Sequence, residues 1–192
     1  MTGRRVIDYD DALTAARRQF VATGGLSMES LANDLSVSRA TLYRVVGSRD
    51  RLLGDVLWQL ARRTLTLAIQ QVERTDLTGV DRLLQISHRF HEEVARFGPF
   101  RRLLQREPVD AFRILFTSSG RVHERIVQAW SDLLSQALEV GELDGLPFDV
   151  DETAYLFVRI GESILYGDML AGIVPDGKLA DKLRRSILAS PS

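Results

Sequence analysis

Several residue types and patterns are missing from this chain, and each absence narrows what it can be. Its 192 residues include no cysteine, which excludes disulfides and thiolate metal sites. No run of about 18 uncharged apolar residues appears, so we expect no membrane-spanning segment and no membrane partner. The first residues lack the apolar stretch of a secretory signal. We therefore expect a cytoplasmic protein.

Signatures of catalysis are scarce as well. The sequence has three histidines, no glycine-rich phosphate loop and no Gly-x-Ser-x-Gly nucleophile motif, so we expect neither an enzyme nor a cofactor. His88 and His91 have a spacing that metal ligands can use, with Glu92 next to them, but a third ligand is missing. The sequence therefore predicts no metal site and no catalytic residue.

Lysine is nearly absent, and almost all of the positive charge is carried by arginine. The net charge is -1, so overall charge gives no sign of a nucleic-acid partner. Of 25 basic residues only Lys178 and Lys182 are lysines, and arginine binds phosphate and guanine with a fork that lysine lacks. A GC-rich genome would also favour arginine codons. Residues 1–51 hold eight arginines against six acids, an excess too small to separate these alternatives.

The hydrophobic pattern is helical throughout. Hydrophobic residues make up 45% of the chain, enough for a buried core, and they recur at helical spacing. Turn signals of β-hairpins between alternating apolar residues are missing. We expect an all-α protein of about nine to ten helices. The predicted helices span 8–22, 27–35, 38–46, 49–74, 80–96, 99–106, 108–117, 120–140, 151–171 and 177–189.

The segment 27–53 has the pattern of a helix-turn-helix. Two short helices that cross at a steep angle need a small residue where they touch, and Ala32 supplies it. Ser36 falls at the tight turn, where the backbone is expected at or near positive φ. Leu31, Val37 and Leu42 are spaced to fill the core between the two helices.

The predicted helix 38–46 begins with an exposed polar face. A recognition helix presents its N-terminal residues to base edges in the major groove. Arg39 can bind guanine through two hydrogen bonds, and Ala40 or Thr41 can meet a thymine methyl group. Tyr43 and Arg44 can hold phosphates, which orients the helix without selecting a sequence. The alternative is the solvated face of an ordinary three-helix bundle.

Further contacts to DNA are expected outside that helix. Arg49 begins the next helix, where backbone N–H groups already favour an anion, and the start of the helix at Ser27 and Met28 can act in the same way. Arg4 and Arg5 form a short basic arm. The complete predicted DNA-binding set is Arg4, Arg5, Ser27, Met28, Ser38, Arg39, Ala40, Thr41, Tyr43, Arg44 and Arg49.

These residues resemble the DNA-binding domain of the TetR/AcrR family of transcriptional regulators. Three positions depart from the family pattern: Ser36 replaces the turn glycine, Val45-Val46 an aromatic pair, and Arg49 a lysine. The resemblance implies a DNA-binding domain over 1–50 and an effector-binding and dimerisation domain over 51–192. The matching residues are Phe20 with Gly24, Ser27, Leu31-Ala32, Ser36-Val37-Ser38, Thr41 to Val46, and Arg49 to Leu53.

The C-terminal part resembles one subgroup of that family. Segments 100–118 and 154–172 are similar to the QsdR-type subgroup, which implies a lactone or acyl-chain effector. A pocket for the effector is expected among the fourth to eighth helices, from 49–74 to 120–140, although an aromatic side chain at helical spacing is more often part of a core. The predicted ligand-binding residues are Trp58, Phe90, His91, Phe97, Phe112, Phe116, Trp130, Arg159, Glu162 and Tyr166.

The resemblance also implies that helices 120–140 and 151–171 pair with their copies in a dimer. Each of the two carries an apolar stripe, and Gly161 allows a close helix approach. The alternative is packing within one chain. The predicted interface residues are Val122, Ile126, Ala129, Leu133, Val158, Gly161, Leu165 and Asp168.

Taken together, the sequence predicts a ligand-responsive regulator, a repressor that binds a palindromic double-stranded DNA operator as a homodimer and is released by a small hydrophobic or amphipathic effector. Two other functions stay open at this point. One is an enzyme that acts on a small lactone or ester, and the other is a helical interaction protein that keeps the helix-turn-helix as a scaffold.

Overall fold

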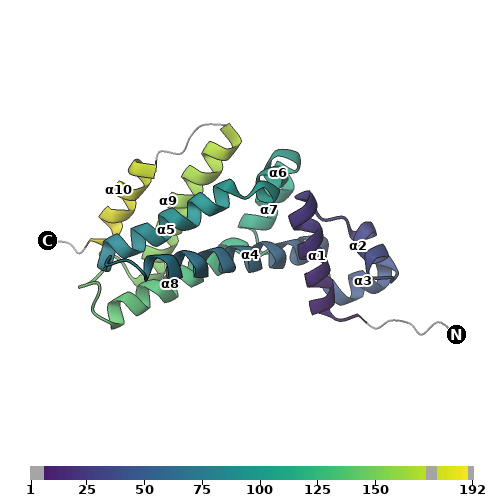
Figure 1. The fold of residues 1–192 in the computed structure, drawn as a ribbon, viewed down its shortest axis with the longest axis horizontal. Coiled ribbons are helices and arrows are strands. Elements are labelled where there is room, and N and C mark those ends of the chain that lie inside the picture. The colour runs from purple at the N-terminus through teal and green to yellow at the C-terminus, as the bar shows by residue number, and fades with distance from the viewer. Residues whose placement is uncertain (1–6, 172–176, 190–192) are drawn as a thin grey trace. The chain divides into compact units, whose positions relative to one another are not determined.

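The computed structural model describes residues 7–171 and 177–189. That part of the chain contains ten helices and no strand, which confirms the all-α prediction (Figure 1). Each predicted helix end falls within two residues of the observed one. The helices are α1 (Tyr9–Thr23), α2 (Met28–Asp34), α3 (Arg39–Val46), α4 (Arg49–Val72), α5 (Gly79–Arg96), α6 (Gly98–Arg106), α7 (Pro108–Phe116), α8 (Val122–Glu139), α9 (Val150–Ala171) and α10 (Gly177–Leu188).

The helices form two compact units. The first contains the described residues up to Leu60 together with Phe97–His123, and the second contains Ala61–Arg96 and the described residues from Glu124 onward. Helices α6 and α7 therefore group with the N-terminal helices. The predicted domain boundary after residue 50 stays a prediction.

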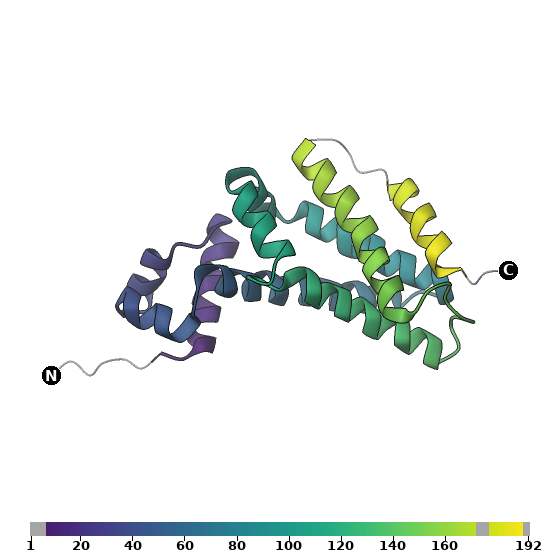
Figure 2. The same cartoon turned by 180° about the vertical axis from the view of Figure 1, so that it is seen from behind.

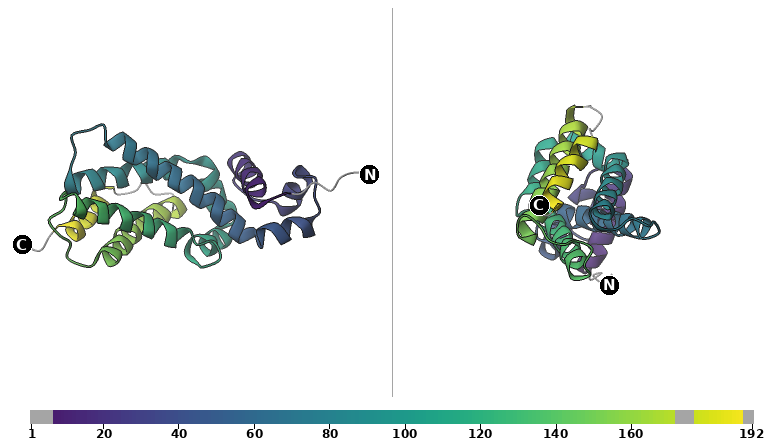
Figure 3. Two further views of the ribbon diagram at one scale, coloured as in Figure 1. Left: turned by 90° about the horizontal axis from the view of Figure 1, so that it is seen from below. Right: turned by 90° about the vertical axis from the view of Figure 1, so that its left-hand side faces the viewer.

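Helix α1 is set by signals at both of its ends. Asp8 and Asp11 form a capping box, in which each side chain accepts from the other residue's backbone N–H. The helix ends at Gly24, whose φ of 79° lies in the left-handed region that glycine adopts readily. Between them, Ala12, Ala16 and Phe20 are fully buried. Helix α1 thus presents its apolar face to α2 and α3, which lie beside it (Figure 3, left).

The turn between α2 and α3 has the predicted geometry. Ser27 caps α2 and Ser38 caps α3, each through its side-chain oxygen. Ser36 has a φ of 56°, which confirms the positive φ expected at the turn. Ala32 and Leu42 are buried between the helices, and Gly47 ends α3 with a φ of 79°. The helix-turn-helix is therefore braced by its apolar residues and closed by its caps.

Helices α6 and α7 are attached to the N-terminal helices by close contacts. Arg102 of α6 donates from Nε to the carbonyl of Thr23, at the C-terminal end of α1, at 3.2 Å. A Cβ on Gly54 of α4 would overlap the backbone of Gly120, which follows α7. Because glycine has no side chain, the two segments can pack backbone to backbone at this point.

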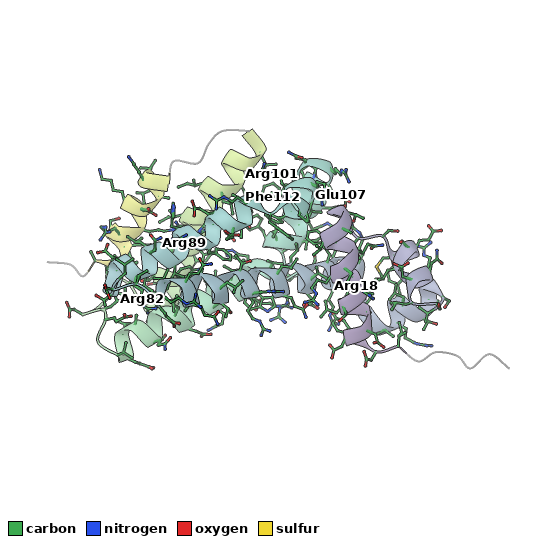
Figure 4. All side chains as sticks on the ribbon, viewed as in Figure 1. Arg18, Arg82, Arg89, Arg101, Glu107 and Phe112 are labelled. Atoms are coloured by element: carbon green, nitrogen blue, oxygen red, sulfur yellow. The ribbon has the colours of Figure 1, made fainter. Side chains whose placement is uncertain are left out.

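The second unit is built from α5, α8, α9, α10 and the latter half of α4. Helix α10 packs on α9 and α5, and Figure 2 shows α9 and α10 from the far side. Trp130 of α8 and Phe157 of α9 are buried with ring centroids 4.5 Å apart. Arg82 of α5 (Figure 4) binds Glu142, from the loop after α8, at 2.6 and 2.9 Å. In the described residues, no helix has the length and apolar character needed to cross a membrane.

Candidate DNA-binding surface and ligand site

The first turns of α3 form a polar surface without a carboxylate. Arg39, Ala40, Tyr43 and Arg44 are exposed, whereas Leu42 is fully buried. The helix has no acidic residue in its first turn and carries Arg44 in its last. Burial of its apolar side therefore turns the predicted recognition face toward solvent, with two guanidinium groups available.

The start of α3 is held in place by a small hydrogen-bond network. The Ser38 Oγ accepts from the Thr41 backbone N–H at 3.1 Å and lies 2.9 Å from the Thr41 Oγ1. Ser38 is exposed and Thr41 is half-buried. Ser38 thus acts as the helix cap, and Thr41 is positioned by that cap rather than projecting freely.

Arg49, expected at a phosphate, binds groups of its own chain. Its Nε donates to the Leu26 carbonyl at 2.9 Å, and its Nη2 donates to the Glu107 Oε2 at 2.6 Å. Glu107 lies between α6 and α7 (Figure 4). A phosphate contact by Arg49 would have to compete with these bonds, so its role at DNA stays a prediction.

The remaining residues predicted to contact DNA differ in how far their side chains are exposed. Ser27 is exposed and caps α2. The Met28 side chain is buried, with 5% of its surface exposed, so only its backbone N–H could serve a phosphate. Arg4 and Arg5 lie outside the described residues.

Four predicted ligand-binding residues belong to the first unit. The rings of Phe112 and Phe116 stack along α7, with centroids 5.5 Å apart. Phe97 lies 6.5 Å from Phe20 of α1, so it extends the core of that unit. Trp58 on α4 is half-buried.

The other six predicted ligand-binding residues belong to the second unit. Phe90 and Trp130 are buried, and Phe90 meets the His91 ring edge to face at 5.2 Å. The predicted ligand-binding residues are therefore divided between the two units. The polar members in the second unit lie on helices α5 and α9: His91, Arg159, Glu162 and Tyr166.

The clearest polar feature inside the second unit is the contact between His91 and Arg184. The Arg184 Nη2 lies 3.2 Å from the His91 Nε2, and the Arg184 Nε donates to the Phe157 carbonyl at 3.3 Å. The guanidinium also lies over the Phe157 ring, 5.0 Å from its centroid. Arg184 is only 3% exposed. A cation is therefore enclosed with an aromatic ring on one face and an imidazole and a backbone carbonyl as its hydrogen-bond partners.

The Nε2 of His91 accepts a hydrogen bond from Arg184, because the Nδ1 of the same ring is the donor to another group. Its Nδ1 lies 2.6 Å from the Ser87 carbonyl, so Nδ1 carries the proton and Nε2 is the acceptor. Desolvation of the ring, followed by the charge of Arg184, lowers the pKa of His91 to about 3. Desolvation likewise lowers the pKa of Arg184 to about 10. Near neutral pH the pair is a neutral imidazole with a charged guanidinium.

Helix α9 contributes a second buried charged group, the carboxylate of Glu162. Glu162 is 6% exposed, and its Oε2 is 3.4 Å from the Arg159 Nη1, the pairing that their spacing suggested. Tyr166 is also buried, and desolvation with the nearby charge of Glu162 raises its pKa. Helix α9 therefore carries a carboxylate and a phenol group into the interior of the second unit.

Most residues predicted for the dimer interface are buried inside the single chain. Val158 and Leu165 are 3% and 4% exposed, and a Cβ on Gly161 would overlap the Arg184 and His91 side chains. A side chain already removed from water has little surface left for a second copy. Ala129 is half-buried, and the side chain of Asp168 lies outside the described residues. The others, all buried, are Val122, Ile126 and Leu133.

Sequence reasoning missed Arg184 and Glu107. The spacing of Ala180, Arg184 and Leu188 places an arginine in the buried row of α10, and a charge in such a row is a signal that could have been noticed. Glu107 gave no signal, because its partner Arg49 is far away in the sequence.

The three histidines do not come together. His88 lies 3.5 Å from Glu92, His91 faces Ser87 and Arg184, and His123 packs against Phe116 with ring centroids 5.9 Å apart. Within the residues that the structure describes, no group of three or more metal-ligating side chains occurs.

Comparison with known proteins adds independent findings. The family model described as "Tetracyclin repressor-like, C-terminal domain" matches residues 78–189. Among solved structures, the transcriptional repressor QsdR from R. erythropolis, of the TetR family, superposes with a TM-score of 0.83 at 26% identity over 95% of each chain. The fatty acid degradation regulator FadR from Bacillus halodurans has a TM-score of 0.56 at 13% identity, over 96% of this chain and 100% of its own, which reflects the fold alone. Among curated proteins, none matches in sequence.

Proposed function

The chain belongs to the tetracycline-repressor-like family of transcriptional regulators, and from this premise we propose that it is a ligand-responsive repressor. In this proposal a homodimer binds a palindromic operator through α3, and a small hydrophobic or amphipathic effector releases it. The observation that carries the proposal is the exposed, carboxylate-free start of α3 on a braced helix-turn-helix.

The proposed contacts to DNA divide into two kinds. Arg39, in the first turn of α3, donates to the N7 and O6 of a guanine, and Ala40 meets a thymine methyl group. Tyr43 and Arg44 hold phosphates and set the position of the helix in the groove. Substitution of Arg39 should then change sequence preference, whereas substitution of Arg44 should weaken all sequences alike.

Homodimerisation is proposed because a palindrome requires two recognition helices about 34–36 Å apart. We place the centre of the interface on the outer side of α9, where Tyr155 and Leu156 remain 49% and 36% exposed. These two residues have apolar surface to bury, unlike Val158 and Leu165 on the inner side. Sedimentation of Leu156→Asp should show loss of the dimer. A Val158→Ala variant that dissociates while Leu156→Asp does not would move the interface to the inner side.

The effector is proposed to bind in the second unit, near the polar groups that α9 carries inward. A lactone or an acyl chain is the ligand class that the family resemblance favours, and the aromatic surroundings of Phe157 and Trp130 suit an apolar tail. An effector can shift the protein off DNA only by binding one conformation better than the other. Release should therefore depend on effector concentration and should be reciprocal, with operator DNA weakening effector binding.

The enzyme alternative receives little support from the buried serine–histidine contact. The Ser87 Oγ lies 3.3 Å from the His91 Nδ1, but Ser87 is fully buried and that nitrogen donates to a carbonyl. A histidine so bonded does not take a proton from a hydroxyl. Turnover of a lactone or ester that is abolished by His88→Ala or His91→Ala would favour the enzyme instead.

The test is a titration of the full-length protein on a labelled fragment that carries the promoter of its own gene. Salt-sensitive binding of the wild type, lost in Arg39→Ala/Arg44→Ala, supports the regulator. Arg63→Ala is the matched control, because Arg63 is an exposed arginine on α4 outside the first unit. Absence of salt-sensitive binding in all three proteins would favour the helical interaction protein.

A further inference from the structure

Arg184 is a buried cation that forms no ion pair within the described part of the chain; the Asp181 carboxylate, three residues earlier on α10, acts on it only through its charge, which raises the pKa of Arg184. Its side chain is 3% exposed, and no carboxylate among the described side chains lies within ion-pair distance. The neighbouring Arg185, by contrast, is 54% exposed and pairs with Asp81. Arg184 is thus unlike the other arginine of the same turn in both burial and pairing.

The hydrogen bonds of Arg184 leave much of its donor capacity unused. Its Nε donates to the Phe157 carbonyl and its Nη2 to the His91 imidazole, and no described group accepts from Nη1. A guanidinium has five N–H groups in a planar fork. Both partners are neutral, so neither offsets the charge. A buried charge is costly unless it is paired, and a carboxylate is the partner that the fork fits best.

The positions around Arg184 hold the guanidinium in place. A Cβ on Gly161 would overlap the Arg184 Nη2 and the His91 Nε2, so glycine at this position is what lets the guanidinium lie against α9. The Phe157 ring covers one face of the guanidinium, and Trp130 packs on Phe157. The arrangement is a fixed cation with an aromatic ring on one face, and a second ring packed behind the first, which suits a ligand with one anionic head and an apolar tail.

We propose that Arg184, supported by His91, binds the carboxylate head of an acyl-chain effector inside the second unit. This inference rests on the proposed function, since it names the chemistry of the effector. It also favours one of the two effector classes. A lactone carbonyl carries no charge and can accept from only part of the fork, so it leaves Arg184 without an ion pair.

The experiment compares head groups at constant chain length. Octanoate, decanoate and dodecanoate are titrated into the full-length protein by calorimetry, and the tightest is then compared with the alcohol and the γ-lactone of the same carbon number. We expect the carboxylate to bind at least tenfold more tightly than either neutral analogue. Equal or tighter binding of the lactone, or no binding of any carboxylate, would overturn the proposal.

Two variants assign the preference to Arg184. Arg184→Met should keep the fold, because an apolar side chain of similar length replaces a buried unpaired charge, and should lose the tenfold preference. Arg185→Met, the matched control on the same helix turn, should retain it. A preference that survives in Arg184→Met contradicts the assignment. If Arg184→Met does not fold, Arg184→Lys keeps the charge without the fork, and an undiminished preference in that variant contradicts the assignment equally.

A DNA titration separates this inference from the proposed function. Arg184→Met without ligand should bind the promoter fragment as the wild type does, but octanoate, decanoate or dodecanoate should no longer release it. A wild type that binds carboxylates but no DNA would reject the proposed function and leave the head-group preference standing. A wild type that binds DNA and shows no head-group preference would reject this inference alone.

Discussion

Arg49, the first residue of α4, is tied to Glu107 between α6 and α7, with 2.6 Å between the Nη2 and the Oε2. The same guanidinium binds the carbonyl of Leu26, just before α2. One side chain therefore connects the helix-turn-helix, the start of α4 and the α6–α7 junction, all within the first unit. Segments more than 50 residues apart in the sequence are joined at this point.

A double-mutant cycle measures this connection. Arg49→Ala, Glu107→Ala and the double variant should show a coupling free energy of about 0.5–1 kcal/mol in urea unfolding, since both side chains are partly solvated. The exposed pair of Arg96 and Glu93 is the matched comparison, with an N–O distance of 3.8 Å and an expected coupling near zero. Additive effects at Arg49 and Glu107 would mean that the connection contributes nothing to stability.

Replacement of the turn residue Ser36 by glycine should stabilise the protein. Ser36 has a φ of 56°, a conformation that costs a residue with a Cβ more than it costs glycine. Ser36→Gly should therefore raise the free energy of unfolding by up to about 1 kcal/mol. Ser30→Gly is the control inside α2, where glycine should lower it by about the same amount. Thermal denaturation that ranks the two variants the other way would contradict the turn geometry.

Substitution by alanine should have opposite effects on stability at two glycines of α9. Gly161→Ala places a methyl group where Arg184 and His91 lie, so we expect a loss of about 1–3 kcal/mol in unfolding free energy. Gly167→Ala meets no atom within 4 Å and should gain about 0.5–1 kcal/mol from helix propensity. A Gly161→Ala protein as stable as the wild type would show that the side chains of Arg184 and His91 pack elsewhere.

The buried imidazole predicts a stability change on acidification. The pKa of His91 is lowered in the folded protein to about 3, whereas the unfolded chain titrates near 6.5. As the pH falls below 6.5, the unfolded state binds a proton that the folded state refuses, so stability decreases. Between pH 6.5 and 5 the loss should be about 1.5 kcal/mol.

Urea unfolding across that pH range, with His91→Gln alongside, isolates this effect. The variant should lose most of the dependence between pH 6.5 and 5, where few carboxylates titrate. His88→Gln is the control, because His88 is partly exposed and faces Glu92. An unchanged dependence in His91→Gln would show that His91 is accessible to protons in the folded state.

The helices and the turn geometry could be predicted from sequence because their signals are local. Caps such as Ser27 and Ser38, and apolar residues such as Leu42, act within a few positions of one another. The polar interior of the second unit could not be predicted, because Arg184 and His91 are brought together from α10 and α5. For the same reason the helical stripe containing Val158 and Leu165 predicted that both residues are buried but not what covers them. Both are buried within their own chain, and their contact with a second copy stays a prediction.

Binding to operator DNA is the most direct test of the account. Fluorescence anisotropy of a labelled promoter fragment, titrated with full-length protein at several salt concentrations, should show salt-dependent binding by the wild type and by Arg63→Ala. Arg39→Ala should lower the binding free energy by about 1–3 kcal/mol and relax the base preference at one position. Arg44→Ala should reduce the slope of the logarithm of the binding constant against the logarithm of salt concentration by about one. Wild-type binding by the Arg39→Ala/Arg44→Ala protein would contradict the claim that α3 is the element that enters the groove.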